Sequence, residues 1–247
     1  MTNYQFSADQ ISQHVVKFSA DLHPAVNMEE TRPAMQSFAN GLIDQFPEYF
    51  ETLVSGPRQF RVNKTFKINT GQAEIITLAW GQRGPVLTLP KRLFISGPQD
   101  VNGPDPDIVI NRAIQELGER FPDRGIPRVS LIHNIVFDTD QANSLEIVAA
   151  NFTKESWRSQ INSTRIQLQG ERDGKMLAYD IRPTYVSPGG RAAWPAPDDA
   201  RFGVVVAVDI AVADAENMVS PEAVGDLLSF NQYYVPGELV NFLNGVS

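Results

Sequence analysis

The chain has 247 residues, 42% of them hydrophobic, and its 21 basic and 29 acidic side chains leave a formal net charge of −8 at pH 7. This composition is that of a globular protein, and the acidic balance disfavours binding to the phosphates of nucleic acids. The absence of cysteine excludes disulfides, thiolate nucleophiles and zinc sites built on thiolates.

The first 14 residues do not predict a signal peptide, because no basic segment precedes an apolar core. No stretch of the chain approaches the roughly 18 uninterrupted apolar residues of a membrane-spanning helix. We therefore expect a cytoplasmic protein that does not contact a membrane.

Residues 11–22 form the first predicted element, and they fit two patterns. Some of the apolar residues recur at helical spacing, whereas others alternate as in a strand. We favour a strand because the β-branched residues Val15 and Val16 lie near its centre and Pro24 ends the run.

A helix and a series of strands follow. Residues 31–46 have apolar side chains at helical spacing, with Thr31 as the N-cap and Pro33 in the first turn, and Pro47 ends the helix. The strands that follow are separated by turns containing glycine and proline. They are predicted at residues 58–68, 72–80, 85–89 and 92–96.

Residues 97–107 have the composition of a loop. We place there the boundary between an N-terminal half, residues 1–100, and a C-terminal half, residues 101–247, of one compact unit. The loop leads into a second helix, with Asp105 as its N-cap and Pro106 at its first position. The first and the second predicted helix both close on a Phe-Pro pair, which suggests two similar halves.

The remaining elements are again mostly strands. Asp173-Gly174 is the turn of a predicted hairpin, and Ser220 caps a C-terminal helix that Pro236 kinks or divides. In chain order we predict a strand (126–138), a short polar helix (154–162), the hairpin (163–185), a loop rich in proline and glycine (187–201), a strand apolar on both faces (202–214) and the C-terminal helix.

Runs of consecutive strands interrupted by isolated helices predict an α+β protein. We expect a largely antiparallel sheet, or two sheets, covered by about three amphipathic helices. Regular alternation of strand and helix is missing, which argues against a doubly wound parallel sheet.

His133 is one of only three histidines and the first candidate for a catalytic residue. In a strand its side chain shares a face with Leu131 and Ile135, whereas Asp138 points to the other face. A dyad of His133 and Asp138 would therefore require residues on opposite faces to meet. We favour a core histidine with a local hydrogen bond over a general base.

Asp209 lies within an otherwise apolar strand, where a carboxylate has to be paired or hydrogen-bonded. Ala207 and Ala211 share its face and leave room for an arginine such as Arg182. We favour a structural ion pair over an active-site acid.

We expect neither a metal nor a cofactor. His14 and His23 lack the spacing of metal ligands, and the acidic pairs in the chain are explained by helix capping and turns. The chain also lacks the glycine motifs that bind phosphates and the elbow of serine hydrolases.

Two features are candidates for partner binding. Trp194, in the loop of residues 187–201, is a candidate anchor because aromatic side chains dominate the energetics of interfaces. The second is a basic stripe, which is more commonly a solvated face of a sheet than a docking surface. It comprises Arg58, Arg61, Lys64 and Lys67. Nucleic-acid binding would require this stripe to join other basic residues on one face.

The series of elements resembles an uncharacterised family of bacterial and archaeal proteins that has about this length and a sporadic distribution. The resemblance rests on the segments LIDQFPEYF, RVSLIHNI and VVVAVDIAV and on the C-terminal helix. Ser130, Ile132, His133 and Ile135 depart from the family's pattern, which has glycine, arginine, tyrosine and asparagine there. The family has no established activity, so the resemblance implies only that His133 replaces a structural aromatic residue.

We therefore expect a non-enzymatic cytoplasmic protein that acts through contacts with a protein partner or with itself. It would be a subunit, adaptor or regulator of an accessory or mobile-element-linked system. The alternative is a small-molecule-binding protein or hydrolase with a cleft near His133 and Asp209.

Overall fold

The computed structural model describes residues 4–56, 59–68, 71–94, 98–140, 144–152, 165–186, 201–214 and 218–245. Within these ranges, ten antiparallel strands form one sheet, in the order β2-β3-β4-β5-β1-β7-β10-β9-β8, with β6 paired to β5. The strands are β1 (Ile11–His23), β2 (Thr52–Gly56), β3 (Gln59–Ile68), β4 (Gly71–Trp80), β5 (Pro85–Phe94), β6 (Pro98–Asp100), β7 (Gly125–Asp140), β8 (Ile166–Arg172), β9 (Lys175–Val186) and β10 (Arg201–Ala213).

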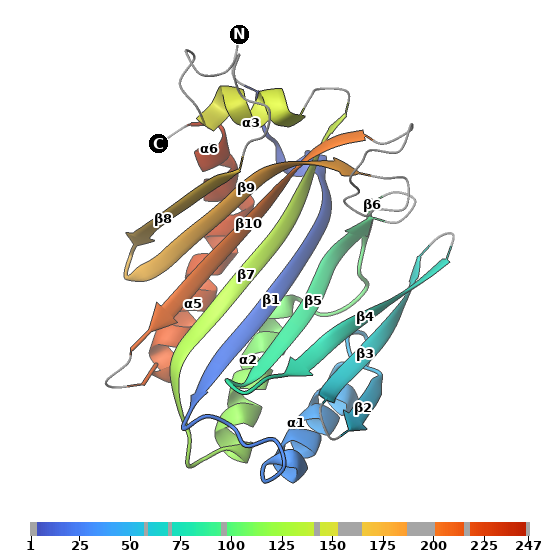
Figure 1. The fold of residues 1–247 in the computed structure, drawn as a ribbon, viewed down its shortest axis with the longest axis vertical. Coiled ribbons are helices and arrows are strands. Elements are labelled where there is room, and N and C mark those ends of the chain that lie inside the picture. Colours follow the sequence, from blue (N-terminus) through green and yellow to red (C-terminus); the bar gives the residue numbers. More distant parts are fainter. Residues whose placement is uncertain are drawn as a thin grey trace.

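The main helices cover one face of this sheet, and α3 lies at one end of it (Figure 1). The predicted α+β class with an antiparallel sheet is thus confirmed, although the described part of the chain has more helices than the three expected. They are η1 (Ala8–Gln10), α1 (Arg32–Gln45), α2 (Pro106–Arg120), α3 (Ser144–Phe152), α5 (Pro221–Tyr233), the π-helical turn η2 (Tyr234–Glu238) and α6 (Leu239–Leu243).

The centre of the sheet is the long antiparallel pair of β1 and β7, and β10 pairs with the other side of β7. Alternate residues of these strands, such as Phe18, Leu131 and Val206, are fully buried beneath the helices. The strand predicted for residues 11–22 is therefore confirmed, because its alternating pattern matches a sheet with one covered face.

β10 corrects one expectation. Val204, Val206 and Val208 are fully buried on the covered face, but Ala207 and Asp209 on the other face are only partly buried. Since the helices cover one face alone, this strand is not buried on both sides along its whole length.

The N-terminal strands differ in detail from the prediction. The segment predicted at residues 85–89 and the described part of the one at 92–96 form a single strand, β5, that continues through Pro90. β2 was not predicted, and β6 lies within the predicted loop of residues 97–107.

The predicted starts of the helices are confirmed. Asp105 Oδ1 accepts a 3.0 Å hydrogen bond from the N–H of Asp107, and Ser220 Oγ accepts one of 3.2 Å from Ala223. Thr31 occupies the N-cap of α1, but its hydroxyl donates to the Asn27 carbonyl at 2.6 Å instead.

The predicted division of the C-terminal helix is also confirmed. Pro236 lies in η2, where the α-helical hydrogen bonding of α5 gives way to a π-helical turn before α6.

The predicted hairpin is formed by β8 and β9. Asp173 and Gly174 both have positive φ, 49° and 70°, as a two-residue type I′ turn requires. The polar helix predicted at residues 154–162, most of the loop at 187–201 and Trp194 within it lie outside the described residues.

Candidate functional site

A cleft opens where the sheet divides. β4 pairs with β5 through only three residue pairs, from Leu78 with Leu87 to Trp80 with Pro85. Beyond these pairs the two strands diverge, and the short β6 pairs with β5 instead (Figure 1). A pocket of about 660 Å³ lies between the diverging strands and the segments that follow α1 and β6.

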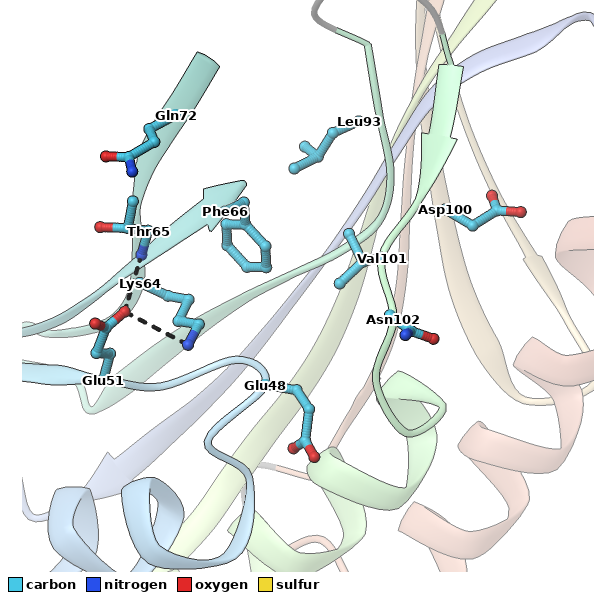
Figure 2. A pocket seen from close by; sticks show the side chains of 10 residues that line it. All are labelled: Glu48, Glu51, Lys64, Thr65, Phe66, Gln72, Leu93, Asp100, Val101 and Asn102. Carbon is cyan, nitrogen blue, oxygen red and sulfur yellow. Dashed lines mark hydrogen bonds and ion pairs between the residues drawn. The ribbon is translucent and has the colours of Figure 1, made fainter. Parts of the chain in front are cut away.

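The floor of this cleft is apolar (Figure 2). Phe66 from β3, Leu93 from β5 and Val101 after β6 point toward its middle. Phe66 and Leu93 are each only 7% exposed, so they belong to the edge of the core as well as to the cleft. The polar lining consists of Glu48, Glu51, Lys64, Thr65, Gln72, Asp100 and Asn102.

The charges of the cleft are partly neutralised. Lys64 Nζ lies 3.4 Å from Glu51 Oε2, which also accepts a 3.3 Å hydrogen bond from the N–H of Thr65 (Figure 2). Asp100 points away from the middle, and a hydrogen bond from Arg92 lowers the pKa of its carboxyl group.

Glu48 is different. No hydrogen bond or ion pair holds its carboxylate within the described part of the chain, and its side chain is exposed. The cleft therefore offers an apolar floor and one carboxylate that is available to a ligand.

His133 lies far from solvent on the covered face of β7, with 1% of its surface exposed. Its Nδ1 is 3.0 Å from Nε2 of His14 on β1. Burial, reinforced by the positive charge of Lys91, lowers the pKa of His133 to about 4. Burial, followed by the neighbouring His133, Lys91 and Arg92, also lowers the pKa of His14 well below its ordinary value. Both rings are therefore neutral at pH 7.

A second polar pair, on the helices, lies next to the histidine pair. Asn231 of α5 donates a 3.1 Å hydrogen bond from Nδ2 to Asp107 Oδ1 at the start of α2. His133 Nε2 and Asn231 Oδ1 are buried without a hydrogen-bond partner, yet the amide is close enough to oppose the fall in the pKa of His133. A proton on Nε2 of each ring fits this arrangement, with His14 donating to His133. The His14–His133 pair therefore links β1 with β7, and the separate Asn231–Asp107 hydrogen bond links α5 with α2.

Asp209 lies on the open face of the sheet, with 29% of its side chain exposed. Its carboxylate is 3.3 Å from Arg128 Nη2 and accepts a hydrogen bond from the hydroxyl of Ser130. The arginine partner is thus Arg128 of β7 and not Arg182 of β9. Asp209 also borders a pocket of about 440 Å³.

The candidate catalytic residues His133, Asp138 and Asp209 do not share a site. His133 lies on the covered face of the sheet, whereas alternation places Asp138 on the open face together with Asp209. The sheet therefore separates the imidazole from both carboxylates, and neither ring of the histidine pair hydrogen-bonds to a carboxylate in the described structure.

The basic stripe is not one surface. Arg61 and Lys64 lie on opposite faces of β3, since strand residues alternate, and Lys64 is the one that lines the cleft. Lys67 belongs to the same strand. Arg58 and Trp194 lie outside the described residues.

The sequence did not single out Glu48, Phe66 or Val101 as site residues. They come from three separate segments, and only the divergence of β4 from β5 brings them together. The sequence does contain one signal of the cleft, a proline within β5. Pro90 has no N–H, so it predicts that one side of β5 is unpaired at that point.

Within the described ranges, no group of three or more histidine, cysteine or acidic side chains is arranged to hold a metal ion. The same part of the chain contains no helix with the length and apolar character needed to cross a membrane.

No protein-family model matches the chain, and no curated protein or solved structure is significantly similar to it. The resemblance to the sporadic prokaryotic family therefore stays a prediction. What the protein does has to be inferred from the residues of its own surfaces.

Proposed function

We propose that the protein binds a partner protein through the cleft between β4 and β6. The observation that carries this proposal is the short pairing of β4 with β5, which leaves the backbone of residues 72–76 without a strand partner on that side in the described structure. An extended segment of a partner could add to such an edge through main-chain hydrogen bonds. The apolar floor lies directly beside it.

The side chains of the cleft indicate the chemistry of the segment. Phe66, Leu93 and Val101 suit an apolar side chain, because its burial removes apolar surface from water. Glu48 suits a lysine or arginine next to it, and the net charge of −8 favours the approach of a basic segment. The ligand is thus an extended segment with an apolar residue beside a basic one.

This proposal gives a physical form to the expected role as a subunit, adaptor or regulator. A cleft that supplies backbone hydrogen bonds and a few side-chain contacts recognises a segment of another protein without chemical change. The accessory or mobile-element-linked system remains part of the proposal.

A library of nine-residue peptides, selected on the purified chain, tests this function. We expect the enriched sequences to place a lysine or arginine next to an apolar residue. Val101→Arg puts a long cation into the floor and should weaken binding of the enriched peptides more than tenfold, as titration calorimetry would measure. Glu48→Lys should weaken binding about threefold to tenfold and reduce its dependence on salt.

Glu119→Lys is the matched control, because it reverses an exposed charge near the C-terminal end of α2, whereas the cleft residues Val101 and Asn102 precede the start of this helix. It should bind the peptides as the unmodified chain does. Peptides that bind equally well to the Val101→Arg variant, while its thermal unfolding is unchanged, would rule out the cleft as the site.

We also propose that the chain consists of two similar halves. The order of elements supports this. β1 precedes a series of strands in which β5 pairs back with β1, and only the three-residue β6 separates β5 from α2. β7 likewise precedes a series whose last member, β10, pairs back with β7 before α5 begins.

A further inference from the structure

β8 is an edge strand with few of the features that prevent edges from pairing. Among the residues that the structure describes it is the last strand in the order of the sheet, and every residue in it except Ile166 is exposed. It pairs with β9 without a bulge and contains neither proline nor lysine, the devices that commonly protect an edge. The opposite edge, β2, is shorter, with five residues.

We propose that two copies of the chain associate through β8, as an antiparallel pair around a two-fold axis at Leu168. The two sheets would then continue into one another. This surface is separate from the cleft between β4 and β6, so the inference does not depend on the proposed function.

The hydrogen-bond pattern of β8 restricts how the copies can pair. In a two-residue hairpin the flanking residues, here Arg172 and Lys175, exchange both backbone hydrogen bonds. Counting back from Arg172, every second residue of β8 (Gly170, Leu168 and Ile166) then directs its backbone N–H and C=O toward β9. Gln167, Gln169 and Glu171 direct theirs outward and must meet outward-directed residues of the second copy. An axis at Leu168 satisfies this condition, since it pairs Gln167 with Gln169 of the second copy.

The same axis produces complementary side-chain contacts on the open face. Arg165 of one copy lies opposite Glu171 of the second copy, and the symmetry makes this pair twice. Arg165 already contacts Asp180 at 2.7 Å, which holds its guanidinium on that face, and it is 57% exposed. Glu171 is exposed, and no hydrogen bond or ion pair occupies its carboxylate in the described structure.

On the covered face the axis brings together apolar surface. Leu168, which is 40% exposed, would meet Leu168 of the second copy, and Ile166 would lie opposite Gly170, which leaves space for it. Beside Leu168 is a pocket of about 910 Å³ lined by Leu177, Tyr179 and Phe242. The second copy would cover part of this apolar lining.

A single introduced cysteine tests the register, because the chain has no cysteine of its own. At a non-hydrogen-bonded antiparallel pair the Cα atoms are about 4.5 Å apart, which permits a disulfide. Leu168→Cys should therefore form a covalent dimer in oxidised glutathione. Gly170→Cys is the control, since a side chain there meets no neighbour in its own copy. Its two copies would be roughly 14 Å apart along the strands, too far to link.

Sedimentation of the unmodified chain and of charge variants completes the test. We expect a dimer, weakened at least tenfold by Glu171→Arg and strengthened again when Arg165→Glu is added. A monomer at about 100 µM would overturn the proposal. Equal cross-linking of the two cysteine variants, or a double charge variant that dimerises no better than Glu171→Arg alone, would also overturn it.

Discussion

His14 and His133 are neutral in the core, and this makes the stability of the fold depend on pH. Their pKa values in the folded chain lie below the ordinary 6.5, so the unfolded chain takes up protons that the folded chain does not. Their contribution is fully present above about pH 6.5 and is lost as the pH falls toward 4. The slope is at most about 1.4 kcal/mol per pH unit for each histidine.

We expect the double variant His14→Leu/His133→Leu to have a smaller loss of stability between pH 7 and pH 4.5 than the unmodified chain. Urea unfolding at a series of pH values measures this slope. His23→Leu serves as the control because His23 is exposed at the end of β1. An unchanged slope in the double variant would show that these two rings do not couple protonation to folding.

At the scale of elements, α1 and α2 meet around a buried carboxylate. Glu116 is 1% exposed, forms ion pairs with Arg112 and Arg120, and accepts a 3.4 Å hydrogen bond from Gln45 of α1. Gly41 makes room for it, since a Cβ there would lie 3.3 Å from the carboxylate.

Glu116→Gln should lower the free energy of unfolding by about 1–3 kcal/mol, because it keeps the size of the side chain but removes the charge that both arginines contact. Urea unfolding monitored by circular dichroism measures the change. Glu119→Gln, on the exposed side of the same helix, should change the free energy by no more than about 0.5 kcal/mol. Equal effects of the two substitutions would contradict a role for the buried ion pairs.

Elements with a strong local pattern could be predicted from the sequence. β7, β10 and the hairpin at Asp173-Gly174 have long alternating or apolar runs or a specific turn. β2 and β6 have five and three residues, too few for a pattern. The cleft depends on which strands pair and where pairing stops, and that is decided by contacts between distant segments.

At the scale of the whole molecule, the central pair of β1 and β7 joins the two predicted halves. We expect one cooperative unfolding transition, because neither half keeps its central strand paired on both sides without the other. Trp80 packs against Phe38 of the N-terminal half and Phe121 of the C-terminal half, with ring centroids 5.3 and 5.2 Å away, and so reports the packing of the two halves on each other. In a Trp157→Phe/Trp194→Phe variant, its fluorescence and far-ultraviolet circular dichroism should change at the same urea concentration. Separate midpoints would indicate independently folding halves.

The three residue pairs between β4 and β5 have one more consequence. They form the only strand-to-strand connection between the meander of β2, β3 and β4 and the rest of the described sheet. A segment that adds to β4 would extend this short ladder along the strand. Binding of a segment in the cleft would then make the meander more rigid. The meander would lose local motion, although no residue of the core had changed its neighbours.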